Sequence, residues 1–101
     1  MKEIKWLVEN IREELEDAEK YAKAAAKYKE EDREMSNTLY TLANEELGHM
    51  DKLHAQAVRI IRAYKAAGHE APAAMQAIWD WEHDKVIEHT AKIRALLDSI
   101  R

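Results

Sequence analysis

Apolar residues recur along this 101-residue chain at alternating spacings of three and four, the pattern of helices that pack side by side. Two breaks divide the pattern, one at Glu31-Asp32-Arg33 and one between Gly68 and Pro72. Asp32 is suited to cap a helix N-terminus, Gly68 suits a helix end, and Pro72 suits the first turn of a helix. The pattern therefore predicts three helices, over residues 2–30, 32–67 and 72–99, in a single all-α domain spanning 1–101.

Each predicted helix carries one stripe of mainly apolar residues. In the first helix the stripe consists of Ile4, Leu7, Ile11, Glu14, Ala18, Tyr21, Ala25 and Tyr28. In the second it consists of Met35, Leu39, Leu42, Glu46, His49, Leu53, Ala57, Ile60 and Tyr64. In the third it consists of Met75, Trp79, His83 (or Glu82), Val86, Thr90, Ile93, Leu97 and Ile100. A period near seven residues favours nearly aligned packing, and the short first connection makes the first two helices an antiparallel hairpin.

The composition agrees with a helical protein and excludes several classes of site. Charged residues make up 36% of the chain and hydrophobic residues 47%, with two glycines and one proline. The lack of cysteine excludes disulfides and thiolate ligands. Apolar runs are too short for a membrane span, and the first residues do not resemble a signal peptide, so a cytoplasmic location is expected. With a net charge of −4 and interspersed basic residues, nucleic-acid binding is not expected.

Three ionisable residues interrupt the apolar stripes. Glu46 and His49 are three apart on the second helix, so their side chains point the same way, and Glu14 interrupts the first stripe. At about 1.5 Å per residue, the three lie roughly 21, 25 and 27 Å from the turn at Asp32. They are therefore expected to meet between the two helices. Burying unpaired charge is costly, and a shared metal ion is the simplest compensation.

This set of ligands is half of a known arrangement. Carboxylates with a neutral imidazole suit iron(II), manganese(II) or zinc(II). Di-iron carboxylate bundles use a Glu from each of two helices and a Glu-x-x-His from each of two others. One hairpin of this chain supplies one Glu and one Glu-x-x-His. A two-fold homodimer, alone or within a larger homo-oligomer, would supply all four Glu and both His.

The hairpin also resembles a known superfamily. Glu14 is followed seven residues later by Tyr21, and the second helix carries the pattern Ala-x-x-Glu-x-x-His-x-x-x-Leu at residues 43–53. Over roughly residues 7–60 these features resemble the ferritin-like superfamily, and Leu42 to His49 looks rubrerythrin-like. With one further helix and no second Glu-x-x-His, the chain is most similar to the encapsulated-ferritin type and to short ferritin-like proteins of bacteria and their phages.

The resemblance implies a ferritin-like four-helix bundle completed by dimerisation around a di-iron site. It implies that Glu14, Glu46 and His49 are both the metal ligands and the catalytic residues. The implied activity is that of a ferroxidase, an oxidoreductase acting on iron(II) with dioxygen or peroxide. The type also implies a possible location inside a protein compartment. Tyr21 is expected to pack in the core or to donate a hydrogen bond to a site carboxylate.

Several alternatives remain open from the sequence. Glu82, His83 and His89 of the third helix are candidates for an extra ligand or for a group that orients one, and a core histidine under Trp79 is an equal alternative. The remaining acidic residues and histidines near the motifs are expected to be exposed: Glu13, Glu16, Asp17, Glu19, Glu45, His54 and His69. The three tryptophans are expected in the core or in subunit contacts. The alternative function is a metal-free helical module for oligomerisation or protein interaction.

Overall fold

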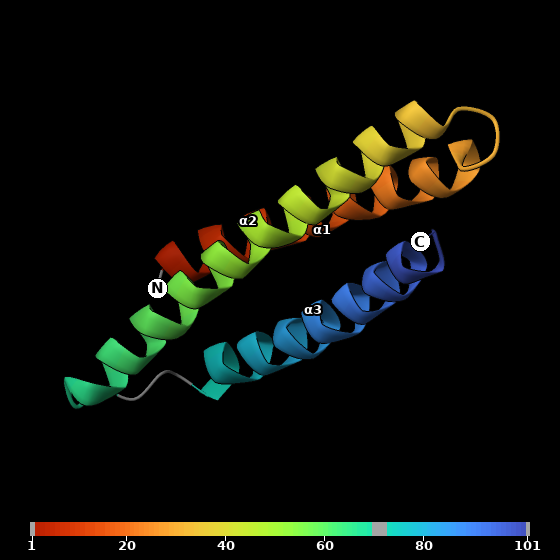
Figure 1. Cartoon of the computed structure of the whole chain (residues 1–101). Helices are drawn as coiled ribbons and strands as arrows, with labels where there is room; N and C mark the ends of the chain where they lie inside the picture. The colour runs from red at the N-terminus through yellow and green to blue at the C-terminus, as the bar shows by residue number, and fades with distance from the viewer. Residues whose placement is uncertain (1, 70–72, 101) are drawn as a thin grey trace.

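The computed structural model describes residues 2–69 and 73–100, without the side chains at 74, 75 and 78. These residues form three α-helices and no strand: α1 Lys2–Tyr28, α2 Arg33–Ala66 and α3 Ala73–Ile100. Figure 1 shows α1 and α2 as a long antiparallel hairpin with α3 lying alongside it. The rod measures 56 × 18 × 18 Å. The all-α prediction is confirmed, with helix ends within two residues of those expected, whereas Pro72 and the side chain of Met75 lie outside the described positions.

The turn between α1 and α2 is fixed by two side chains. The carboxylate of Asp32 accepts a hydrogen bond from the Met35 backbone N–H at 3.1 Å, as expected of an N-cap. The buried Ser36 hydroxyl donates to the Ala25 carbonyl at 2.7 Å, which ties the start of α2 to the end of α1. The hairpin therefore has a defined register from this end.

The end of α2 is closed by a left-handed glycine. Gly68 has φ +85° and donates to the Lys65 carbonyl at 3.0 Å, while His69 donates to the Tyr64 carbonyl at 3.3 Å. This pair of hydrogen bonds satisfies two of the last carbonyls of the helix. Any residue with a Cβ would be strained at this backbone conformation.

The predicted stripe is buried over most of α1, whereas on α2 the buried residues lie mostly one position after it. On α1, Leu15 and Ala22 are buried, while the predicted Glu14 and Tyr21 are half-buried. On α2 the buried residues are Ser36, Ala43, Leu47, Met50 and Ala57, of which only Ala57 belongs to the predicted stripe. The prediction followed the side of the hairpin on which the two helices alone would meet. A third helix packs on the other side and moves the centre of the core toward itself.

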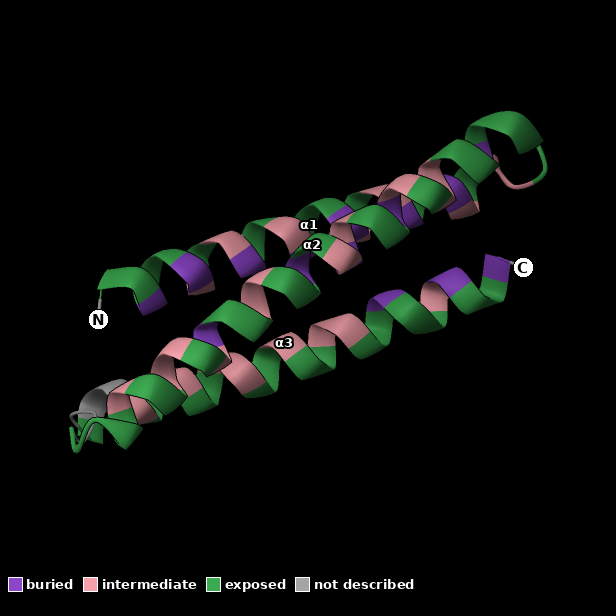
Figure 2. Cartoon of the chain, turned by 60° about the vertical axis from the view of Figure 1, so that its left-hand side comes forward, coloured by how far each residue is buried: buried purple, intermediate pink, exposed green. Residues whose placement is uncertain are grey.

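α3 covers one side of the hairpin. Its buried residues are Ile93, Leu97 and Ile100, toward its C-terminal end (Figure 2). Trp79 and Val86 of its N-terminal half are half-buried, in agreement with the predicted stripe of this helix. Two ion pairs join α3 to α1, Arg12–Glu82 at 2.8 Å and Glu19–His89 at 3.1 Å.

Within the described residues, no helix packs against the opposite side of the hairpin. On α2, the side chains of Asp51 and His54 point toward α3, since both line a cavity with α3 residues. A helix turns by about 100° per residue, so one sector of α2, about 60° wide, contains positions 42, 46, 49, 53 and 60. The centre of this sector lies about 140° from the side of α2 that faces α3. On α1, Glu14 lies about 140° from Glu19, which contacts α3. We call this side the open face; it carries Glu14, Tyr21, Leu42, Glu46, His49, Leu53 and Ile60.

None of the helices, over the residues that are described, combines the length and apolar character needed to cross a lipid bilayer.

Candidate metal centre

Glu14, Glu46 and His49 converge on the open face. Each offers one ligand atom, and these atoms all lie within 4.8 Å of one another. His49 Nδ1 is 3.4 Å from Glu14 Oε2 and 3.8 Å from Glu46 Oε1. The predicted meeting of the three side chains is confirmed, because the antiparallel hairpin brings Glu14 level with the Glu46–His49 turn of α2.

The burial of the three residues differs from the prediction. The side chains of Glu14 and Glu46 are 26% and 19% exposed, whereas that of His49 is 53% exposed. The group therefore lies at the edge of the hairpin seam rather than on the buried stripe. An ion held here would be open to the solvent on one side in a single copy of the chain.

The two carboxyl groups are not independent. Glu14 Oε2 is buried and has no hydrogen-bond partner. A hydrogen bond with the Glu14 carboxylate raises the pKa of Glu46 to about 7, and burial and the negative charge of Glu14 act in the same direction. The Glu46 carboxyl group is therefore partly protonated at neutral pH. A buried carboxylate oxygen without a hydrogen bond, a second carboxyl group and an adjacent imidazole are a donor set that fits a divalent transition metal ion.

Apolar side chains border this group along the open face. Leu42, Leu53 and Ile60 of α2 and Tyr21 of α1 are half-buried. Among the described hydrogen bonds none joins Tyr21 to a site carboxylate, so the suggested donor role is not seen in a single chain. A half-buried apolar rim around a charged centre is a surface that a second helical hairpin could cover.

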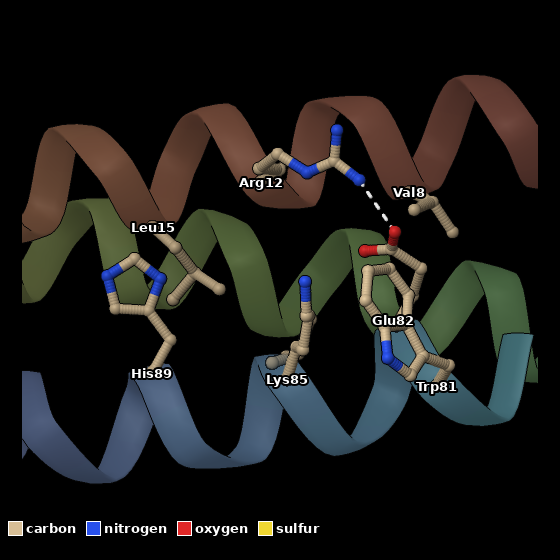
Figure 3. A pocket seen from close by; sticks show the side chains of 8 residues that line it. Val8, Arg12, Leu15, Trp81, Glu82, Lys85 and His89 are labelled. Carbon is tan, nitrogen blue, oxygen red and sulfur yellow. Dashed lines mark hydrogen bonds and ion pairs between the residues drawn. The ribbon is translucent and has the colours of Figure 1, made fainter. Parts of the chain in front are cut away.

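The three candidates on α3, Glu82, His83 and His89, do not join this group. Glu82 accepts a hydrogen bond from Arg12 at 2.8 Å and lines a cavity of about 420 Å³ between α1 and α3, together with Lys85 and His89 (Figure 3). The His89 imidazole lies 3.1 Å from the Glu19 carboxylate, which corrects the expectation that Glu19 is only a solvated side chain. These contacts hold α3 on the side of α1 away from Glu14.

His83 is part of a ring stack that the sequence pattern did not reveal. Its ring centroid lies 5.0 Å from that of His54 and 5.8 Å from that of Trp79. His54 is half-buried, not exposed as expected, and burial followed by the charge of His83 lowers its pKa, against an opposing effect of Asp51. The expected packing of His83 against Trp79 is therefore present, but His83 is half-buried and not a core residue.

The expected exposure of the other acidic residues and of His69 is confirmed, whereas two of the three tryptophans are exposed. Glu13, Glu16, Asp17, Glu45 and His69 are exposed, as predicted. Trp79 is half-buried, but Trp6 and Trp81 are 59% and 56% exposed, so these two tryptophans are not in the core of a single chain. The Lys85 ammonium lies 3.4 Å from the centroid of the Trp81 ring, a cation–π contact on the surface.

Comparison of the chain with protein-family models, with curated proteins and with solved structures found no match. What the site does must therefore be argued from its own residues.

Proposed function

We propose that this chain forms a homodimer that binds a pair of transition metal ions between its two hairpins and oxidises iron(II). The observation that carries the proposal is the meeting of Glu14, Glu46 and His49 around the buried Glu14 Oε2, which makes no hydrogen bond and lies 3.4 Å from His49 Nδ1. A buried carboxylate oxygen without a hydrogen bond is unfavourable, and a cation satisfies it directly. Iron fits the donor set, and manganese or zinc fits it too.

The dimer follows from the number of ligands and from the surface around them. One chain offers two carboxylates and one imidazole, which leave a single ion under-coordinated. Two copies related by a two-fold axis would pool four carboxylates and two imidazoles, enough for two ions in a four-helix bundle of ferritin-like type. The apolar rim of Leu42, Leu53 and Ile60 would supply the contact, and it would cover the exposed imidazole of His49.

The residues of the chain have distinct roles in this arrangement. Glu14, Glu46 and His49 of both copies would hold the ions, and the apolar rim would exclude bulk water. Loading with iron would displace the proton that Glu46 holds at about neutral pH. The chemistry supplied by iron is one-electron oxidation: two iron(II) ions give up two electrons, which with two protons reduce dioxygen to hydrogen peroxide.

Iron binding by matched variants tests the proposal. All proteins in this comparison carry His83→Phe, so that the neighbouring imidazoles of His54 and His83 cannot take up an ion together. The parent, which is wild type at Glu46 and His49, is treated with a chelator and then given iron(II) in air. It should retain about one iron per chain and develop the near-ultraviolet absorbance of ferric iron bound by oxygen ligands. The double variant Glu46→Ala, His49→Ala should bind little. Glu13→Ala and Glu45→Ala, which remove exposed carboxylates adjacent to the ligands, should bind as the parent does. Equal iron in the double variant and the parent would end the metal hypothesis.

A metal-free helical module for oligomerisation or protein interaction is the second candidate. The observation in its favour is the half-buried apolar rim itself, which would drive association without any ion. The same experiment distinguishes the two candidate functions when dimerisation is measured together with iron binding. A chain that dimerises fully in the presence of chelator and binds no iron is an interaction module, whereas metal-dependent binding through Glu46 and His49 supports the dinuclear site.

A further inference from the structure

α2 carries a second acid-x-x-His pair, five residues after the first. Asp51-Lys52-Leu53-His54 repeats the spacing of Glu46-Leu47-Gly48-His49. Five residues turn the helix by about 140°, so the second pair points away from the open face and toward α3. There it meets the imidazole of His83, whose ring centroid is 5.0 Å from that of His54. Two imidazoles and one carboxylate thus border one space between two helices.

A shared ion requires these side chains to turn, because among the described residues only Glu14, Glu46 and His49 already bring their ligand atoms within 4.8 Å of one another. The distance between the two rings leaves room for such a change. With a metal–nitrogen bond of about 2.0–2.1 Å, an ion lies roughly 3.2 Å from the centre of each imidazole that binds it. Two ring centres 5.0 Å apart then enclose an angle of about 100° at the ion, close to tetrahedral. The rings are now nearly parallel, at an interplanar angle of 20°, so binding requires them to turn about χ2, which is a soft torsion for histidine.

The surroundings include room for an ion, a polar atom that lacks a partner, and one opposing charge. Asp51, His54 and His83 line a cavity of about 330 Å³, together with Thr90 and Arg94. The hydroxyl oxygen of Thr90 is buried and has no hydrogen-bond partner. Arg94 lies 3.8 Å from Asp51 and competes for the carboxylate, but both side chains are more than half exposed and free to separate.

We propose that Asp51, His54 and His83 form a mononuclear site for a divalent first-row transition ion, separate from the centre on the open face. Two histidines and one carboxylate with positions left for water are typical ligands of iron(II) and also suit zinc(II). Because His83 comes from α3 and the other two ligands from α2, an ion here would join the N-terminal half of α3 to the hairpin.

Cobalt(II) binding in a background without the first centre tests this site. The background variant is Glu46→Gln, His49→Asn, freed of metal with a chelator and titrated with cobalt(II) under visible absorbance. We expect about one cobalt per chain. His83→Phe, which keeps a ring against Trp79, should weaken binding at least tenfold. His89→Phe, the matched control on the same helix, should leave it unchanged. No binding by the background chain, or equal binding by the two α3 variants, would overturn the proposal.

Asp51 and Arg94 are exposed, so replacing either of them should change cobalt(II) binding without disturbing the packing of the core. Asp51→Asn should weaken cobalt(II) binding severalfold, with Asp98→Asn as the exposed control on α3. Arg94→Gln should strengthen binding at least threefold, because it removes the cation that competes for Asp51. Circular dichroism of each variant confirms that its helices are intact. Unchanged affinity in both Asp51→Asn and Arg94→Gln would remove the carboxylate from the site and contradict the proposal.

Discussion

Glu46 shares a hydrogen bond with Glu14, and this contact raises its pKa from 4.5 to about 7. The folded, metal-free chain therefore holds this proton more tightly than the unfolded chain does. Stability gained in this way is complete below the ordinary pKa and is lost as the pH rises through about 7. Urea unfolding with chelator present should show this contribution falling between about pH 5 and 8.

Glu46→Gln isolates the effect of that proton. The glutamine amide can still donate to Glu14 but does not titrate, so the stability of the variant relative to the wild type should increase with pH over the same range. Glu45→Gln, one residue away and exposed, is the control and should follow the wild type. Parallel pH profiles of wild type and Glu46→Gln would show that the two carboxyl groups are not coupled.

His54 gives a pH dependence of opposite sign. Burial between α2 and α3, and then the charge of His83, lower its pKa below 6.5, so the unfolded chain binds this proton more readily. Stability should therefore fall as the pH drops below about 6.5. Urea unfolding in a Glu46→Gln background with chelator measures how stability depends on pH between about pH 5 and 7. His54→Phe should reduce this dependence, whereas His69→Asn, at an exposed position, should leave it unchanged. A His54→Phe profile as steep as its parent's would contradict this assignment.

At the scale of helices, local signals in the sequence were sufficient to place the elements. Asp32 and Gly68 terminate helices through hydrogen bonds that need only neighbouring residues, so the sequence predicts both ends well. The buried face was predicted well for α3 and for most of α1, but not for α2. Glu14 and Leu15 compete for the same stripe, and the choice depends on α3, whose position no local pattern specifies.

The meeting of the three candidate ligands was also predictable from local features of the sequence. The convergence of Glu14 with Glu46 and His49 depends only on the rise of a helix and on an antiparallel hairpin. The roles of Glu82, His83 and His89 depend on which side of the hairpin α3 occupies. The partnership of His54 with His83 was missed because His54 is off the apolar stripe, although its spacing from Asp51 repeats the first motif.

Gly48 provides a test of how α2 packs. It lies in the interior of the helix, and an added Cβ would meet nothing within 4 Å, so no close helix contact in the single chain requires glycine. Gly48→Ala should raise the free energy of unfolding by about 0.5–1 kcal/mol because alanine has the higher helix propensity. Urea unfolding measures this, with Leu47→Ala in the buried core as the contrast, expected to lose about 2–5 kcal/mol. A loss of stability in Gly48→Ala would reveal a contact on this side of α2.

At the scale of the whole molecule, the open face decides whether the chain acts alone. Leu42 is half-buried on this face and lies four residues before Glu46. Leu42→Glu should leave the helices of a single chain intact, because the side chain can reach solvent, but should dissociate a dimer formed through this face. Ile87→Glu, which changes a 56% exposed residue of α3, is the matched control and should leave the dimer intact. Sedimentation velocity separates the two results.

The most direct test of the shared centre is native mass spectrometry of the iron-loaded protein, which reports the number of chains and of metal ions in one particle. We expect dimers, or multiples of dimers, that carry two iron ions for every two chains at the Glu14–Glu46–His49 centres. For a clean count the protein would carry His83→Phe, which removes the proposed second site. A monomer with its full complement of iron, or a dimer without iron that no longer forms when Leu42 is replaced, would contradict a metal centre shared between two copies.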